Sequence, residues 1–194
     1  MNLPNKLTVS RLVLTVVFVG MFYVPSSIRE TMAMLVFGAA SLTDYFDGEI
    51  ARKRGLVTNF GKLMDPLADK ILMCAALMLL SAEDHLIPAW AVVIVMAREF
   101  FVTGIRLIAS AQGAVLAAEG LGKHKTAWQM ITVIYFLLQQ ASQEPLCHWL
   151  QPLFAWKPTS PAVFGTISIT MMVTLTLVSG LSYFWKNRQL FDDA

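Results

Sequence analysis

The sequence predicts an all-α integral membrane protein whose six helices form a transmembrane bundle. Hydrophobic residues make up 56% of the 194-residue chain and charged residues only 14%, whereas a soluble domain usually has about 25% charged residues. Most of the apolar segments approach the ~20 residues that a helix needs to cross a bilayer. Basic residues are concentrated in alternate loops between these segments, which is typical of a multi-pass membrane protein.

Six apolar segments follow one another along the chain. The first ends at Pro25, and the fourth has Pro88 in its first turn, where proline is tolerated. The second and third have polar ends, which must face protein or water if these segments cross the membrane. The segments cover approximately residues 7–24, 29–55, 61–81, 86–109, 125–141 and 161–185.

The loops predict the orientation of the chain. Ten basic residues fall on the side that includes both chain ends, and two, Arg29 and Lys157, fall on the other side. The positive-inside rule therefore places both termini on the cytoplasmic side. The opposite side has the longest connection, residues 142–160, whose tryptophans suit a membrane interface.

Composition also limits the class of protein. A net charge of +2 gives no indication of nucleic-acid binding. Cys74 and Cys147 have neither metal-binding nor redox spacing. The sequence contains no internal repeat, no low-complexity tract and no boundary between domains. We therefore expect residues 1–194 to form a single membrane domain.

Four carboxylates lie close together in this apolar sequence. Asp44 and Asp47 are spaced i,i+3, and Asp65 and Asp69 are spaced i,i+4, so each pair shares one face of a helix. A short turn around residues 55–58 predicts a helical hairpin that brings the two pairs to similar depth. Carboxylates at membrane depth are costly without a partner, and an all-oxygen ligand set favours Mg²⁺, Mn²⁺ or Ca²⁺. The alternative is a set of solvated acids or ion pairs with neighbouring basic residues.

Small residues and one arginine accompany the aspartates. Gly48, Ala51 and Gly61 would let a ligand pack against the backbone, although small residues also line contacts between membrane helices. Arg52 offers a forked set of donors that suits a phosphate. Its alternative role is to anchor the cytoplasmic end of the helix.

Basic residues in the fourth and fifth segments predict a pocket that binds a phosphate group. Arginines inside a membrane span are costly and usually face a cavity or a partner. Arg106, Lys123 and Lys125, with Arg98 as a further candidate, would bind the phosphate of an acceptor in a cytoplasmic pocket. The alternatives are an ion pair between Arg98 and Glu99 and, for the other three, anchoring of loops.

The complete pattern is Asp-x2-Asp-Gly-x2-Ala-Arg-x8-Gly-x3-Asp-x3-Asp, from Asp44 to Asp69. It resembles the signature of the CDP-alcohol phosphotransferase family at all eight fixed positions. The resemblance implies a six-helix membrane fold, usually dimeric, with one or two Mg²⁺ or Mn²⁺ ions at the cytoplasmic face. It also implies that an alcohol hydroxyl attacks the β-phosphorus of a CDP-linked lipid and that CMP leaves.

The resemblance also implies roles for individual residues. It assigns the metal to the four aspartates, and it assigns to Asp69 the further role of the catalytic base that accepts the proton of the attacking hydroxyl. The residues implied to contact the cytidine diphosphate are Asn5, Thr8, Gly48, Ala51, Arg52 and Gly61.

Three further stretches are similar to the bacterial phosphatidylglycerophosphate synthases, a branch of the same family: Asn-Leu-Pro-Asn-Lys-Leu-Thr-x2-Arg from Asn2, Arg-Glu-x3-Thr-Gly-Ile-Arg-Leu-Ile-Ala from Arg98, and Gly-Lys-x-Lys-Thr-x2-Gln from Gly122. We therefore expect CDP-diacylglycerol as donor, glycerol-3-phosphate as acceptor, and a homodimer in the bacterial inner membrane whose active site faces the cytoplasm.

Two kinds of alternative stay open. Within the class, serine, inositol phosphate, choline or ethanolamine would replace glycerol-3-phosphate as the acceptor. From another class, a divalent-cation transporter would use acidic residues to bind the ion itself. The position of the aspartates at helix ends, beside small residues and Arg52, favours the enzyme.

Overall fold

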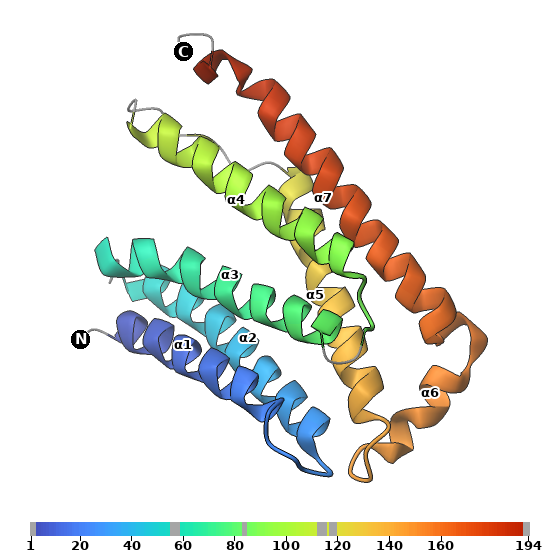
Figure 1. Cartoon of the computed structure of the whole chain (residues 1–194). Coiled ribbons are helices and arrows are strands. Elements are labelled where there is room, and N and C mark those ends of the chain that lie inside the picture. The colour runs from blue at the N-terminus through green and yellow to red at the C-terminus, as the bar shows by residue number, and fades with distance from the viewer. Residues whose placement is uncertain (1–2, 55–58, 83–84, 112–115, 117–119, 192–194) are drawn as a thin grey trace.

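The computed structural model describes residues 3–54, 59–82, 85–111, 116 and 120–191, and for residues 3–8, 44–54, 59–66, 69, 111, 190 and 191 it describes the helical backbone alone. Every element in these parts of the chain is helical (Figure 1), which confirms the predicted all-α class.

Six long helices occupy the positions of the six predicted segments within the described residues. The fifth begins at Gly120 rather than near Lys125, so the basic residues expected at its start lie inside its first turns. A short helix, α6 (Gln151–Ala155), lies in the connection before the last long helix. The long helices are α1 (Leu3–Met21), α2 (Arg29–Arg54), α3 (Asn59–Ala82), α4 (Ala89–Ala111), α5 (Gly120–Ala141) and α7 (Thr166–Lys186).

The long helices alternate in direction, so their termini gather at two ends of the bundle (Figure 1). The N-terminal end of α1, the C-terminal end of α2 and the first turn of α3 lie together at one end, which we call the motif end. Helices α4 and α7 also finish toward the motif end, whereas α6 lies at the opposite end.

Aromatic side chains fix the helices against one another in the interior. The ring centroid of Phe18 on α1 lies 5.4 Å from that of Phe22 and 5.7 Å from that of Phe37 on α2. Tyr135 on α5 packs edge-to-face against Phe154 on α6, with centroids 5.5 Å apart. These contacts bury large apolar surfaces and hold the helix ends in fixed relative positions.

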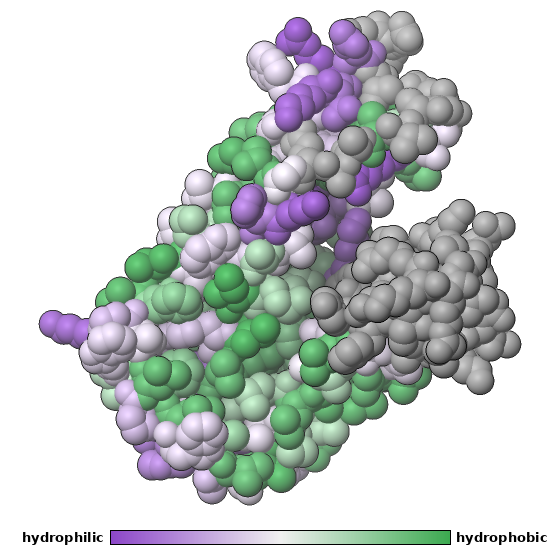
Figure 2. All heavy atoms as spheres, turned by 180° about the vertical axis from the view of Figure 1, so that it is seen from behind, coloured by the Kyte–Doolittle hydropathy of each residue, from purple (hydrophilic) through white to green (hydrophobic). Residues whose placement is uncertain are grey.

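Large apolar side chains also cover much of the outside. Val16 and Leu107 are each 72% exposed, and Leu181 is 68% exposed. Figure 2 shows hydrophobic spheres over most of the lower part of one face and hydrophilic spheres gathered in its upper part. Judged by length and composition, one helix of the described residues, Pro161–Lys186, is apolar enough to cross a membrane. An apolar exterior of this extent indicates contact with lipid or with another protein.

Glu144 caps the first turn of α2 at the end opposite the motif. Its two carboxylate oxygens accept hydrogen bonds from the backbone N–H groups of Glu30 and Thr31, at 2.7 and 2.8 Å. The first N–H groups of a helix have no partner within the helix, and the positive end of the helix dipole favours a carboxylate. Glu144 therefore joins the segment after α5 to the start of α2.

We predict that Glu144→Ala lowers the free energy of unfolding by about 1–2 kcal/mol, because two N–H groups lose their acceptor. Thermal unfolding of the purified protein in detergent micelles measures this change. Gln143→Ala removes an exposed neighbouring side chain and is the control. Equal melting temperatures for Glu144→Ala and the control would show that the cap does not stabilise the fold.

Candidate active site

The backbone places both halves of the aspartate motif at the motif end. Asp44 lies ten residues before the end of α2, and Asp69 lies ten residues after the start of α3. Asp47 and Asp65 lie seven and six residues from the same helix ends. With a rise of about 1.5 Å per residue, Asp44 and Asp69 each lie ~15 Å from these helix ends, and Asp47 and Asp65 each lie ~10 Å from them. The two halves of the motif therefore lie at matching depths on neighbouring helices.

The other residues of the expected nucleotide site lie on α1, α2 and α3. Helix α1 packs against both α2 and α3, so the helices that carry these residues meet in the bundle. The side chains of the nucleotide residues and of the four aspartates lie outside the described residues, and their roles stay predictions. Asn5 and Thr8 are in α1, Gly48, Ala51 and Arg52 are in α2, and Gly61 is in α3.

The aspartate positions fit a divalent cation. Carboxylate oxygens are the ligands that Mg²⁺ and Mn²⁺ prefer. Two pairs of carboxylates at matching depth on neighbouring helices can supply such ligands from two sides. Among the side chains that the structure describes, no group of three His, Cys, Asp or Glu residues offers a rival metal site.

A cavity of about 560 Å³ lies between α3, α4, α5 and α7, and we call it the cation cavity. The four basic residues that we selected from the sequence share this cavity, together with a fifth that we did not select. One carboxylate, that of Glu99, faces them among the residues described. The cations are Lys70, Arg98, Arg106, Lys123 and Lys125.

Glu99 holds two of these cations. Its Oε1 atom accepts hydrogen bonds from Nζ of Lys125 and, at 3.1 Å, from Nη1 of Arg98. Lys125 is only 2% exposed, and a buried charge is tolerated only when it is paired and hydrogen-bonded. The ion pair between Arg98 and Glu99, which was the alternative for Arg98, is therefore present. Arg98 nevertheless lines the cavity as well.

Tyr183 on α7 supports Arg106. Nε of Arg106 donates a hydrogen bond to the Tyr183 hydroxyl at 3.1 Å, and the guanidinium carbon lies 5.4 Å from the centroid of the ring. Tyr183 is buried, so it provides a fixed surface. The terminal nitrogens of Arg106 can then present a fork to an anion in the cavity.

A glycine on α7 makes room for Arg98. A Cβ atom added to Gly180 would lie 3.0 Å from Cγ of Arg98, which is closer than ordinary contact. Nε of Arg98 is buried and has no hydrogen-bond partner among the described residues. Close packing against Gly180 therefore fixes the position of the Arg98 side chain beside the cavity.

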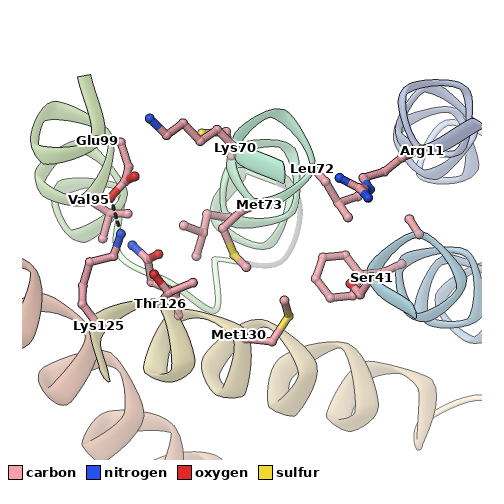
Figure 3. Close-up of a pocket in the computed structure, with 15 residues that line it drawn as sticks. Arg11, Ser41, Lys70, Leu72, Met73, Val95, Glu99, Lys125, Thr126 and Met130 are labelled. Atoms are coloured by element: carbon pink, nitrogen blue, oxygen red, sulfur yellow. Dashed lines mark hydrogen bonds and ion pairs between the residues drawn. The ribbon is translucent and has the colours of Figure 1, made fainter. Parts of the chain in front are cut away.

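A second cavity, of about 300 Å³, adjoins the cation cavity inside the bundle. Lys70, Glu99 and Lys125 line both cavities. Figure 3 shows Arg11 and Ser41 on one side of the second cavity and the ion pair of Glu99 and Lys125 on the other side. The second cavity therefore lies between the cation cavity and the two helices α1 and α2.

Four residues of this region are not predicted from the sequence: Lys70, Thr103, Tyr183 and Gly180. Lys70 had a visible signal, because an ionisable residue within an apolar segment usually faces a cavity or a partner. Tyr183 had none, because it lies 77 residues from Arg106 in the chain and only the fold brings the two together.

Comparison with known proteins identifies the family. The chain belongs to the CDP-alcohol phosphatidyltransferase family, whose model matches residues 1–178. It is 39% identical to the CDP-diacylglycerol–glycerol-3-phosphate 3-phosphatidyltransferase of Bacillus subtilis, over 96% of this chain and 95% of that protein. It is 35% identical to the protein of the same name from Rickettsia typhi, over 94% of this chain and 95% of that protein. These matches confirm the resemblance found in the sequence.

A third relative agrees with this assignment. The chain is 35% identical to a probable phosphatidylglycerophosphate synthase of Mycobacterium tuberculosis, over 94% of this chain and 79% of that protein. The family consists of enzymes, so the chain is an enzyme of the CDP-alcohol phosphatidyltransferase class.

We predict that Gly180→Leu weakens the binding of anions in the cation cavity by about tenfold or more, because a larger side chain displaces Arg98. Gly180→Ala should have an intermediate effect. The rise in melting temperature with added inorganic phosphate measures the binding.

Gly38→Ala is the matched control for this prediction, since a Cβ atom at Gly38 would meet nothing within 4 Å. The same phosphate response in Gly180→Leu and in the control would show that Gly180 does not position Arg98 for binding.

Proposed function

We propose that the chain transfers the phosphatidyl group of CDP-diacylglycerol to glycerol-3-phosphate, and that the products are phosphatidylglycerophosphate and CMP. The observation that carries this proposal is the cation cavity, in which five cations face a single carboxylate among the described residues. Such an excess of positive charge suits an acceptor that has a phosphate of its own. The names of the Bacillus subtilis and Rickettsia typhi relatives support the same pair of substrates.

The acceptor binds by its phosphate. Arg106, Lys123 and Lys125 contact the phosphate, and Arg98 adds a further donor from α4. The acceptor hydroxyl is then directed toward α3, which lines the same cavity and carries Asp69. Asp69 accepts the hydroxyl proton as the oxygen attacks.

The donor binds at the motif end. The four aspartates Asp44, Asp47, Asp65 and Asp69 would hold one or two Mg²⁺ or Mn²⁺ ions, and such ions would supply positive charge against the diphosphate. The acceptor oxygen forms a bond to the β-phosphorus, the bond from that phosphorus to the CMP oxygen breaks, and CMP leaves with the electron pair. The cytidine diphosphate is bordered by Asn5, Thr8, Gly48, Ala51, Arg52 and Gly61.

The membrane arrangement follows from the charge distribution. In this proposal residues 1–194 form one domain whose six long helices cross the bacterial inner membrane, with both termini and the motif end on the cytoplasmic side. The apolar exterior of the bundle supports a place in the membrane, and the basic loops support this orientation. Water-soluble glycerol-3-phosphate then enters from the cytoplasm, and the lipid donor enters from the bilayer. By analogy with the family, the protein is a homodimer.

We predict that the purified protein releases CMP from CDP-diacylglycerol when glycerol-3-phosphate is present and not when serine, inositol phosphate, choline or ethanolamine replaces it. A panel of these acceptors with a CMP assay tests the proposal. Release with serine but not with glycerol-3-phosphate would refute the acceptor assignment. Uptake of a divalent ion into liposomes without any CMP release would instead favour a transporter.

We predict that Asp69→Asn abolishes CMP release while the protein still binds CDP-diacylglycerol, because asparagine keeps the shape and loses the base. A turnover assay and a binding assay on the same preparation separate these effects. Full-rate CMP release by this variant would remove Asp69 from the role of base.

A further inference from the structure

Among the described residues, Lys70 is the one cation of the cavity that comes from α3, and the other four come from α4 and α5. In the chain Lys70 directly follows Asp69. Figure 3 shows its side chain extending from α3 toward α4, where Nζ donates a hydrogen bond to Oγ1 of Thr103. The helix that carries half of the aspartate motif therefore also contributes a charge to the cation cavity.

The contact with Thr103 orients Lys70 without neutralising it. The Thr103 hydroxyl donates its own hydrogen to the backbone carbonyl oxygen of Glu99, at 2.7 Å. Its oxygen is then the acceptor for Lys70. An ammonium group has three N–H donors, and the uncharged Thr103 hydroxyl uses one of them. Lys70 therefore keeps its charge and has donors to offer to a ligand.

The charge of Lys70 is also not cancelled by the acid of the cavity. Oε1 of Glu99 already accepts hydrogen bonds from Lys125 and Arg98. Among the described side chains of the cavity, a single carboxylate cannot balance three further cations, and like charges in a confined cavity repel one another. An anion with two negative charges would relieve this repulsion.

We propose that Lys70 binds the phosphate of the acceptor and thereby sets the distance of the acceptor hydroxyl from Asp69. This proposal rests on the proposed function and deepens it. A phosphate in contact with Lys70 is held beside α3, the helix whose backbone also carries Asp69 one residue earlier.

The kinetics of Lys70→Met test the proposal, because methionine keeps an unbranched apolar side chain and removes the charge. We expect the KM for glycerol-3-phosphate to rise by about tenfold or more, as the loss of a charge-assisted hydrogen bond implies. The KM for CDP-diacylglycerol should stay close to that of the wild-type protein. Lys70→Arg, which keeps the charge, should recover much of the affinity for the acceptor.

Two further variants keep the test decisive if Lys70→Met folds poorly. Thr103→Val removes the hydroxyl that orients Lys70 and keeps the ammonium group, so the acceptor KM should rise by a smaller factor than in Lys70→Met. Lys157→Met is the matched control, because it removes an exposed cation from the 142–160 connection. It should behave like the wild-type protein.

Binding of inorganic phosphate separates the failure of this proposal from the failure of the proposed function. Phosphate should raise the melting temperature of the wild-type protein, and Lys70→Met should need about tenfold more phosphate for the same rise. An equal phosphate response and an unchanged acceptor KM in Lys70→Met would overturn the proposal and leave Lys70 as a tie between α3 and α4. A wild-type protein that ignores phosphate and uses an acceptor without phosphate would overturn the proposed function as well.

Discussion

The ion pair between Glu99 and Lys125 is the interaction on which the cation cavity depends. Lys125 lies inside an apolar bundle with 2% of its surface exposed, and removing an ammonium group from water is costly unless a carboxylate compensates for it. Glu99 provides that carboxylate and at the same time holds Arg98. The cavity can therefore collect positive charge at this depth, because its most buried cation already has a partner.

The start of α2 and the cation cavity differ in whether the chain itself supplies the partners of their polar groups. At the start of α2, both oxygens of Glu144 accept hydrogen bonds from backbone N–H groups, so these groups find their partners within the chain. In the cation cavity, the cations outnumber the one carboxylate among the described residues. Polar groups satisfied by the chain serve stability, whereas an excess of one charge leaves free energy to be gained from a ligand.

The sequence predicts the helices well, because their apolar segments are long and bounded by loops. It also predicts that a cavity is lined by Arg98, Arg106, Lys123 and Lys125, because charged residues in such segments usually face a cavity or a partner. It does not predict which side chains meet across helices. The support of Arg106 by Tyr183 and the passage of Arg98 beside Gly180 depend on how α4 packs against α7. Helix packing is decided by the shapes of many side chains together, so no local pattern in the chain records these pairs. The start of α5 at Gly120 was likewise missed, because the polar residues before Lys125 do not look like part of an apolar span.

Helix α3 explains how one small bundle can bring two very different substrates together. Its first turns carry Asp65 and Asp69 at the same depth as the aspartates of α2, and its next residue, Lys70, reaches the cation cavity. In the proposed reaction the lipid donor is held on the side of α3 that faces α2, and the soluble acceptor is held on the side of α3 that faces α4 and α5. Adjacent residues on a helix point in directions about 100° apart, so neighbouring positions such as Asp69 and Lys70 can serve two different sites. A rigid helix then fixes the distance between the two reactants, and such positioning is the main requirement of phosphoryl transfer.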